Sequence, residues 1–325
     1  MTGKACFFVS RSLQSVRRVN IIAPLNSDVA MKILVSGASS FVGSFVATAL
    51  ARQGHNVVGT FRRHNLRVER LANEPRVKMA ELNLASTNDF FGLPSDIEAI
   101  VHNAGSFPWT DVSIENVLEC NIAGTLNFTN WMRRQKLITR VVTYSTLSVY
   151  GNVLNEILTE NTPVNSNEIY GLSKLASENL MTQTEGYKDQ LIIRLPIVLG
   201  NQAHRAFIPR MVENFRKNIT VEIRNPNKLY NSMTTQKAVA ELTNDYLKSD
   251  TSGKHLVNLG AEKPMTVLQI AKFLKETLSS KSVIFQNEVE SNCYLIDNSR
   301  ATNLGYKAPT VRDALEYYAK DSGWL

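Results

Sequence analysis

A tyrosine and a lysine stand four residues apart in the segment Tyr170-Gly171-Leu172-Ser173-Lys174, which on a helix places both side chains on one face. An ammonium group beside a phenol favours the phenolate and lowers the phenol pKa. A tyrosine tuned in this way can exchange a proton near neutral pH. The alternative is a surface tyrosine with an incidental lysine. Upstream, the segment 144–151 (Y-S-T-L-S-V-Y-G) follows a predicted strand and supplies hydroxyl groups.

A turn that contains glycine joins the first predicted strand to the first predicted helix. A dinucleotide-binding fold places its phosphate loop at this junction, where backbone N–H groups and the positive helix end face a pyrophosphate. We expect Gly37 to permit the tight turn and Gly43 to let helix and strand pack closely. A simple strand–helix turn is the alternative, because the loop is not G-x-G-x-x-G. The candidate cofactor-binding residues of this loop are Gly37, Ser39, Ser40, Phe41, Val42 and Gly43.

The end of the second predicted strand carries two arginines, Arg62 and Arg63. A dinucleotide fold often has an Asp or Glu there, which binds the ribose 2′-hydroxyl of NAD. No acidic residue occurs in the segment 58–63, and arginine suits a 2′-phosphate through charge and forked hydrogen bonds. The pair therefore favours NADP over NAD as the cofactor, and a solvated basic loop is the alternative.

Short apolar runs alternate with helical segments from Met31 onward, which predicts βαβ units around a parallel sheet. The predicted strands are Ile33–Ser36, Asn56–Phe61, Val77–Leu82, Ala99–His102, Arg140–Tyr144, Gln190–Leu195 and His255–Leu259. The main predicted helices are Phe41–Gln53, Ile114–Lys136 and Tyr170–Thr184. The expected fold class is α/β, a Rossmann-like doubly wound parallel sheet with a smaller C-terminal α/β substrate-binding region.

The chain is predicted to divide into an extension and two functional parts. Residues 1–30, nearly free of acidic residues, are expected to be an unstructured or non-native extension, with a targeting segment as the alternative. Residues 31–195 with about 230–260 would form the NAD(P)-binding Rossmann domain. Residues of about 196–229 with 261–325 would form the substrate-binding region.

Composition narrows the classes of partner. The 325 residues hold 36 Lys and Arg against 29 Asp and Glu, a net charge of +7 without a long basic tract, so no nucleic-acid polymer is expected. No run of about 18 apolar residues predicts a membrane span. Three cysteines lie far apart, so neither a metal site nor a disulfide framework is expected, and the cytoplasm is the expected location.

Four blocks together resemble the short-chain dehydrogenase/reductase superfamily. They are the glycine loop, His102-Asn103-Ala104-Gly105, the S-T-L-S-V-Y-G block and Y-x-x-x-K, in that order. More narrowly, the chain from Met31 to Leu325 resembles the extended branch, the NAD(P)-dependent epimerase/dehydratase family, which acts mostly on nucleotide sugars. A homodimer is a further expectation from this family.

The resemblance implies roles for particular residues. Thr146, Tyr170 and Lys174 fall on the family's catalytic positions. Cofactor contacts are implied for Asn103, Ala104, Gly105, Tyr170, Lys174, Pro196 and Ile197. Ser106, Phe107 and Trp109 follow the fourth strand at the carboxyl end of the sheet, and with Ser148 they are candidate substrate-binding residues. Cys120 and Asn121 lie in the predicted helix after the fourth strand. Cys120 is interpreted as a small core residue, and Asn121 as a residue that contacts the active-site backbone.

The chain departs from the family pattern at three places. Ser40 replaces the middle glycine of the usual G-x-x-G-x-x-G, where it could crowd a phosphate or bind it. Asn83 stands where an acidic residue usually follows the third strand. The segment 230–237 differs from the family's usual stretch, which puts the usual sugar-nucleotide contacts in doubt but leaves the hydride chemistry intact.

Three functions are weighed. The first is an NADP-dependent reductase of a keto-sugar nucleotide, which suits an exchangeable NADPH at Arg62 and Arg63. The second is an NAD-dependent nucleotide-sugar epimerase or dehydratase, which keeps its cofactor bound through turnover. The third is a non-catalytic NADP-binding sensor, against which the full set of Thr146, Tyr170 and Lys174 argues.

Overall fold

A seven-stranded sheet forms the centre of the computed structural model, which describes residues 30–108, 112–204, 206–289 and 293–325. Its strand order is β3-β2-β1-β4-β5-β7-β12, and each strand runs parallel to its neighbours. The strands are β1 (Lys32–Ser36), β2 (Asn56–Phe61), β3 (Val77–Glu81), β4 (Ala99–His102), β5 (Arg140–Thr146), β7 (Asp189–Leu195) and β12 (Lys254–Asn258). The chain reverses its direction of travel across the sheet between β1 and β4, where such folds bind ligands.

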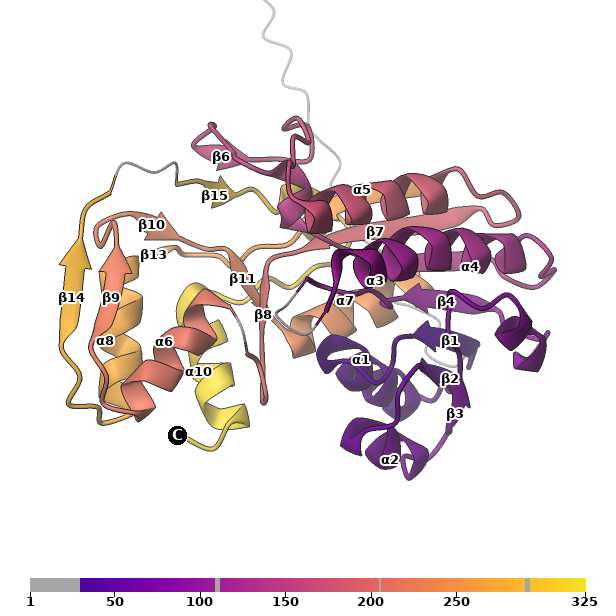
Figure 1. The fold of residues 1–325 in the computed structure, drawn as a ribbon, viewed down its shortest axis with the longest axis horizontal. Helices are drawn as coiled ribbons and strands as arrows, with labels where there is room; N and C mark the ends of the chain where they lie inside the picture. The colour runs from indigo at the N-terminus through magenta and orange to yellow at the C-terminus, as the bar shows by residue number, and fades with distance from the viewer. Residues whose placement is uncertain (1–29, 109–111, 205, 290–292) are drawn as a thin grey trace, which may run out of the picture.

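Helices cover both faces of this sheet (Figure 1). One face carries α1 (Phe41–Arg52) and α7 (Gln236–Lys248), and the other carries α3 (Ile114–Leu118), α4 (Gly124–Met132) and α5 (Ile169–Thr182). The short helix α2 (Leu66–Ala72) contacts α1 and β3. Because successive strand residues face opposite sides, Ile33 packs in the α1 and α7 core and Leu34 in the α4 core. A strand that is buried on both faces consists of consecutive apolar residues, and this pattern allows β1 to be predicted from the sequence.

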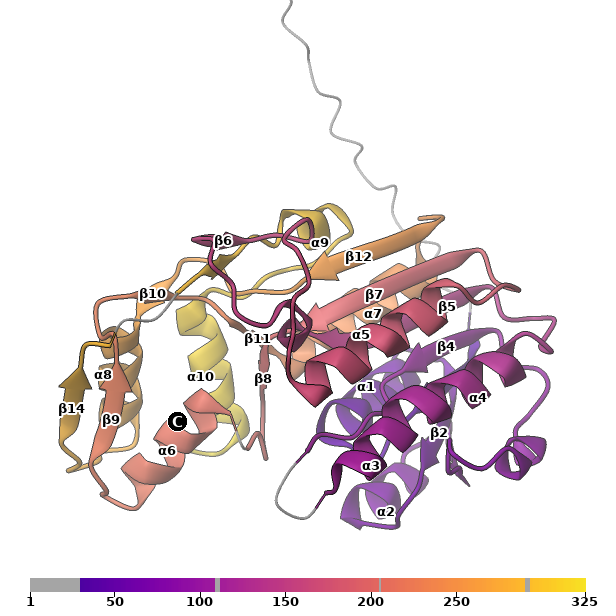
Figure 2. The ribbon, with the colours of Figure 1, turned by 45° about the horizontal axis from the view of Figure 1, so that its top comes forward.

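A second region with its own core lies beside the carboxyl edge of the sheet (Figure 2). Its helices are α6 (Phe207–Arg216), α8 (Val267–Thr277) and α10 (Val311–Asp321), whereas α9 (Ser299–Asn303) packs against β12 and the main core. Its strands are β8 (Ile197–Leu199), β9 (Val221–Arg224), β10 (Leu229–Tyr230), β11 (Met233–Thr235), β13 (Met265–Thr266), β14 (Ile284–Asn287) and β15 (Leu295–Ile296), and β15 pairs with β6 (Ile157–Leu158). Phe215, Ile270 and Leu315 are fully or almost fully buried in this core.

The predicted α/β fold is confirmed. β2 and β4 have the predicted bounds, and the predicted strand His255–Leu259 joins the main sheet as β12. The predicted helix Ile114–Lys136 is wrong in detail, because a π-helical turn at Glu119–Ala123 separates α3 from α4, which ends at Met132. The division into domains stays a prediction, and residues 1–29 lie outside the described residues.

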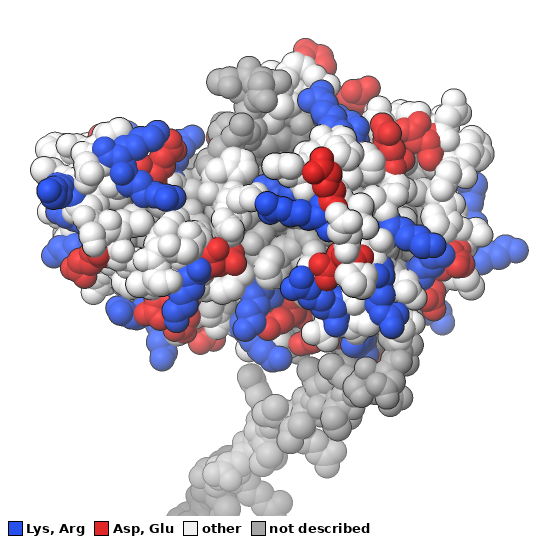
Figure 3. Space-filling model, turned by 90° about the horizontal axis from the view of Figure 1, so that it is seen from below, with Lys and Arg blue, Asp and Glu red and all other residues white. Residues whose placement is uncertain are grey.

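Basic and acidic side chains are interspersed on the face shown in Figure 3, and no continuous basic tract crosses it. The net positive charge is therefore not gathered into one patch on this face. None of the helices in the described ranges is long and apolar enough to cross a membrane.

Candidate active site

Hydrogen bonds tie the glycine loop to the end of β4. The Ser36 hydroxyl oxygen accepts from the backbone N–H groups of Asn103 at 3.2 Å and Ala104 at 3.1 Å. In return, Asn103 Nδ2 donates to the carbonyl oxygen of Gly37 at 3.0 Å and to Ser40 Oγ at 2.8 Å. The two segments that flank the switch point of the sheet are therefore held as one unit.

Two glycines allow this close approach. Gly37 has φ of +66°, and a Cβ on it would lie 2.7 Å from the Cα atom of Ala104. A Cβ on Gly43 would lie 2.4 Å from the Gly37 carbonyl oxygen, so no side chain fits between helix α1 and the loop. Both glycines occupy the structural roles that the sequence indicated.

Replacing Gly37 by alanine is expected to lower the free energy of unfolding and to weaken cofactor binding. A non-glycine residue in this backbone region costs about 1–2 kcal/mol, and the added methyl group would push against backbone atoms of Ala104. Urea unfolding and a fluorescence titration with NADH measure the two effects. Gly54→Ala is the matched control, because Gly54 has φ of +94° with no atom within 4 Å of its Cβ position. The control should lose stability and bind NADH normally, whereas equal binding by both variants would contradict the assignment of the loop.

The hydroxyl of Ser40 caps helix α1. Its oxygen accepts a hydrogen bond from the Gly43 N–H at 3.1 Å as well as the one from Asn103. Both bonds use the lone pairs of the oxygen, so the hydroxyl hydrogen is left to donate to a ligand in the adjoining cavity. This geometry favours a binding role for Ser40 over crowding of a phosphate.

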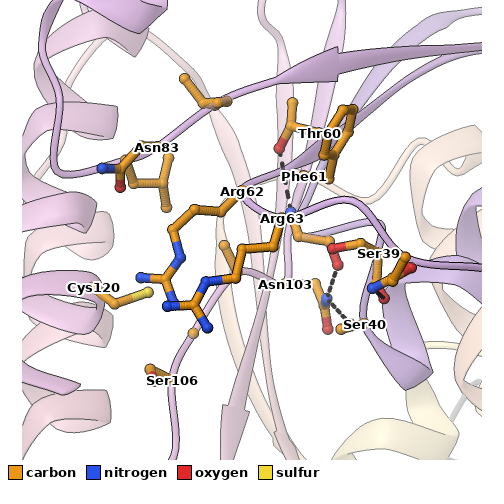
Figure 4. A pocket seen from close by; sticks show the side chains of 16 residues that line it. Ser39, Ser40, Thr60, Phe61, Arg62, Arg63, Asn83, Asn103, Ser106 and Cys120 are labelled. Carbon is orange, nitrogen blue, oxygen red and sulfur yellow. Dashed lines mark hydrogen bonds between the residues drawn. The ribbon is translucent and has the colours of Figure 1, made fainter. Parts of the chain in front are cut away.

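A cavity of about 210 Å³ opens beside the glycine loop. Arg62 and Arg63, both exposed, extend side by side from the end of β2 toward Cys120 and Ser106 (Figure 4). Asn65 borders the same cavity, and its Nδ2 donates to the Ser39 carbonyl oxygen at 3.3 Å. The arginines can therefore meet an anionic group on a ligand that lies along the loop.

A second cavity, of about 700 Å³, lies between the carboxyl edge of the sheet and the second region. Thr146, the last residue of β5, and Tyr170, in the first turn of α5, both line it. Thr146 Oγ1 accepts a hydrogen bond from the backbone N–H of Ser148 at 3.1 Å. The Tyr170 ring packs against Phe107, with ring centroids 4.5 Å apart. Two hydroxyl groups that can contact a reacting oxygen thus stand on one wall.

Lys174 lies one helical turn beyond Tyr170 and is only 4% exposed. A Cβ on Gly105, which lines the first cavity, would lie 3.6 Å from Lys174 Nζ. The ammonium group therefore lies beside Gly105 at the first cavity. No hydrogen bond to it occurs within the described part of the chain, although a buried charge normally requires partners.

Asn121 connects α5 to the segment after β4. Its Oδ1 accepts from the Ser106 N–H at 2.7 Å, and its Nδ2 donates to the Ser106 carbonyl oxygen and to Ser173 Oγ, both at 2.9 Å. The predicted contact of Asn121 with the active-site backbone is confirmed. Cys120 is a correction: it is partly exposed and lines the first cavity instead of packing as a core residue. The π-helical turn that contains both residues rotates the helix face here, and such turns often occur at functional sites.

Burial dominates the pKa values of the site. It raises the pKa of Tyr170 to about 12, against a lowering contribution from the Thr146 hydroxyl. The net direction is thus opposite to the predicted lowering by Lys174. Burial lowers the pKa of Lys174 to about 8. Glu178 and Cys120 act in the opposite direction and raise this pKa. Burial and the charge of Lys174 lower the pKa of His102 to about 3, so this imidazole is neutral at physiological pH.

Most of the residues singled out in the sequence lie at the two cavities. The first is lined by Gly37, Ser39, Ser40, Arg62, Arg63, Asn103, Ala104, Gly105 and Ser106. The second is lined by Phe41, Phe107, Thr146, Ser148, Tyr170, Pro196 and Ile197. Ser106 thus lines the same cavity as the glycine loop, whereas Phe41, Pro196 and Ile197 line the second cavity, and the roles predicted for these residues stay predictions. Val42 packs against the main core, and Trp109 lies outside the described residues.

Several residues that line these cavities were missed in the sequence. Asn65 carries a helix-capping signal, because its side chain accepts from backbone N–H groups at the start of α2. Ser232 lies in the segment 230–237, where the chain departs from the family pattern, and Tyr294 comes from a distant part of the chain and has no local signal.

The residues at the first cavity fit a dinucleotide. The close-packed glycine turn leaves room for a pyrophosphate at the start of α1, where the Ser40 hydroxyl can donate to it, and the two arginines can meet a further phosphate of the dinucleotide. The buried ammonium of Lys174 lies near Gly105 of this cavity, where it could donate to hydroxyl groups of such a ligand.

Comparison with known proteins assigns the chain to a family. A sequence model of the NAD dependent epimerase/dehydratase family matches residues 33–236. The chain is 24% identical over 293 residues, 85% of this chain and 92% of the relative, to the "Putative UDP-glucose 4-epimerase" of Methanocaldococcus jannaschii. Among solved structures, it resembles the UDP-glucuronic acid 4-epimerase of Bacillus cereus in complex with NAD, with a TM-score of 0.77, 22% identity and coverage of 90% of this chain and 99% of that one. It also resembles the UDP-Glc/GlcNAc 4-epimerase of Campylobacter jejuni, with a TM-score of 0.76, 17% identity and coverage of 91% and 99%.

The fold and the matched residues define an enzyme of the NAD(P)-dependent short-chain dehydrogenase/reductase type. The chain belongs to the NAD dependent epimerase/dehydratase family.

Proposed function

We propose that this protein is an NAD(P)-dependent nucleotide-sugar epimerase, which oxidises a sugar carbinol to a ketone and reduces it again from the opposite face. The observation that carries the proposal is the pair of hydroxyls of Thr146 and Tyr170 on one wall of a cavity of about 700 Å³, one helical turn from Lys174, whose ammonium group lies beside Gly105 at the glycine-loop cavity. The names of the similar proteins, which are UDP-sugar 4-epimerases, support the choice of substrate class.

Each polar group would have one task. The bound nicotinamide would supply the hydride acceptor and donor. Tyr170 would take the proton of the substrate hydroxyl during oxidation and return it during reduction. Thr146 would hydrogen-bond the same oxygen and orient it, while Lys174 would bind the nicotinamide ribose and favour the Tyr170 phenolate by its charge. Proton transfer of this kind contributes roughly 10²–10⁴-fold to a rate.

The lining of the cavity favours epimerisation over dehydration. Loss of water from a sugar needs a further acid–base pair that removes a proton beside the ketone and protonates the departing hydroxyl. Among the described residues that line the cavity, the only carboxylate is that of Glu168 and the only imidazole is that of His204, and both side chains are exposed. Epimerisation needs the hydride and the single proton that Tyr170 can carry.

A keto-sugar nucleotide reductase is the second candidate, and Arg62 and Arg63 favour it. Both side chains point into the cofactor cavity, where they suit the 2′-phosphate of NADPH. A reductase exchanges its cofactor in each cycle, which an enzyme specific for NADPH does readily.

The homodimer expected from the family also stays a proposal.

One sample of the purified protein is denatured so that any NAD⁺ or NADH that it retained can be measured. A second, folded sample is incubated with UDP-glucose, UDP-glucuronic acid or UDP-N-acetylglucosamine without added cofactor. Formation of the 4-epimer is followed by proton NMR. Formation of the 4-epimer with no net change in nicotinamide absorbance is the expected result. Consumption of NADPH by a 4-keto nucleotide sugar, with no epimer in any reaction, would replace the proposal by the reductase.

A further inference from the structure

A buried ion pair joins α5 to β7, two helical turns beyond Tyr170. Arg194 donates from Nε to Glu178 Oε1 at 3.0 Å and from Nη2 to Glu178 Oε2 at 2.7 Å. Arg194 is 4% exposed and Glu178 is 5% exposed. Moving both charges out of water is costly, and such a pair often stabilises a fold no better than apolar side chains of the same size. Its position therefore suggests a role other than stability.

The carboxylate of Glu178 shares a helix face with the reactive residues. Tyr170, Lys174 and Glu178 follow one another at intervals of four residues along α5, so each side chain lies one turn beyond the last. Lys174 is thus flanked by the phenol on one side and by the carboxylate on the other. This places a negative charge behind the ammonium group, at the side away from the substrate cavity.

The other end of the pair is held firmly. The Arg194 guanidinium lies over the ring of Tyr150, 4.7 Å from its centroid. The Tyr150 hydroxyl donates to Asn258 Oδ1 at 2.9 Å, which fixes the ring against β12. Residues Leu195–Ile197, which directly follow Arg194, line the second cavity. The carboxylate of Glu178 is therefore held on the sheet by contacts that do not depend on substrate or cofactor.

The groups that face Lys174 come from four elements. α5 contributes the Tyr170 phenol and the Glu178 carboxylate, the π-helical turn contributes the Cys120 thiol and β4 contributes the neutral imidazole of His102. β7 contributes Arg194, which lies on the far side of Glu178. Among these described groups Glu178 alone is negatively charged at neutral pH. It opposes the burial that would otherwise strip the proton from Lys174.

We propose that Glu178 is a positioning residue that keeps the Lys174 side chain charged and directed at the cofactor cavity, and that Arg194 fixes the Glu178 carboxylate for this task. The inference rests on the proposed function only for what Lys174 binds, because the charge of Lys174 can be measured without substrate or cofactor.

The test is a titration of Lys174 by NMR in protein labelled with ¹³C at the lysine Cε. The Lys174 signal is assigned by its absence in Lys174→Met. In the unchanged protein the midpoint is expected near pH 8. In Glu178→Gln it should fall by about 1–3 pH units, because the carboxylate one helical turn away no longer favours the charged form of the lysine.

Cofactor binding gives a second readout. A charged lysine makes stronger hydrogen bonds to ribose hydroxyls than a neutral one. Affinity for NADH or NADPH, measured by nicotinamide fluorescence, should therefore be full at pH values below the Lys174 midpoint and fall as the pH rises through it. In Glu178→Gln this fall should begin at a correspondingly lower pH, while binding at pH 5 should differ much less.

Two further variants keep the test decisive. Glu178→Gln leaves Arg194 buried without its partner, so the double variant Glu178→Gln with Arg194→Met is measured as well, and its Lys174 midpoint should also be lowered. Glu178→Asp retains the charge and should keep the midpoint closer to that of the unchanged protein. Asp189→Asn is the matched control, because the Asp189–Arg140 pair, 3.5 Å apart, lies at the opposite end of β7. It should leave the Lys174 titration in place.

The outcomes separate the two proposals. An unchanged Lys174 midpoint in a folded single or double variant would overturn the role of Glu178. A shifted midpoint in a protein that binds neither NADH nor NADPH at any pH would uphold that role and refute the proposed function.

Discussion

Replacing Tyr170 by phenylalanine is expected to lower the turnover of the nucleotide-sugar substrate by about 10²–10⁴-fold, the usual contribution of proton transfer by a side chain. The substitution removes only the hydroxyl beside Thr146 and keeps the ring that packs 4.5 Å from Phe107. The cavity wall therefore keeps its shape, and affinity for the cofactor should change little. Steady-state rates and a nicotinamide fluorescence titration on the same preparation separate the two quantities.

Tyr317→Phe serves as the control for Tyr170→Phe, because Tyr317 lies on α10 and lines neither cavity. This variant should retain the full rate. A Tyr170→Phe enzyme with an undiminished rate would show that another group moves the proton. A loss of rate that came with a loss of cofactor affinity would point to a disturbed cavity instead.

The pKa of Tyr170 explains why a neighbouring positive charge matters to this prediction. Burial raises that pKa to about 12, so the phenol is protonated at neutral pH and is ready to donate during reduction. During oxidation it must accept a proton, and for that its phenolate has to be stabilised. Lys174, one turn away, can supply a positive charge only while it is itself protonated. The two half-reactions therefore depend on the same local balance of burial and charge that Glu178 influences.

The centre of the main sheet was predictable because strands such as β1 and β4 are apolar on both faces. Ala99–His102 reads as one short buried run, and the helix after the glycine loop follows from apolar residues at helical spacing. The small paired strands of the second region were not predictable in the same way. β14 pairs with β9, which lies some sixty residues earlier, and neither strand has an apolar pattern long enough to identify its partner. Pairing of this kind is decided by tertiary packing.

The residues of the site were predictable where a local motif carries them. The spacing of Tyr170 and Lys174 identifies them as a candidate pair, and the glycine loop is identified by its position after the first strand. Cys120 was misplaced because its residue type favoured a small core residue, whereas the π-helical turn at Glu119–Ala123 places it at the first cavity. The partner of Glu178 could not be found in this way, since Arg194 reaches it from a different element of the fold.

Replacing both Arg62 and Arg63 by alanine is expected to weaken the binding of NADPH relative to NADH by about 100-fold or more. A hydrogen bond to a charged group contributes about 1.5–3 kcal/mol, and the double variant removes the forked donors of both side chains. The two guanidinium groups lie side by side in the first cavity, so they can act together on one phosphate (Figure 4). Fluorescence titrations with NADPH and NADH, made at one salt concentration, give the ratio of the two dissociation constants.

Arg134→Ala provides the matched change of charge, because Arg134 is exposed just after α4 and lines neither cavity. It should leave the ratio of NADPH to NADH affinity unchanged. Equal weakening of both nucleotides in the double variant would mean that the arginines contact a group that the two cofactors share, such as the pyrophosphate. The argument for NADPH would then fall away, and with it the one structural observation that favours the reductase over an epimerase that retains NAD. A selective loss of NADPH affinity would show that the arginines favour NADPH, which an enzyme can exchange during turnover. Any epimerase mechanism for this chain would then have to account for an exchangeable cofactor.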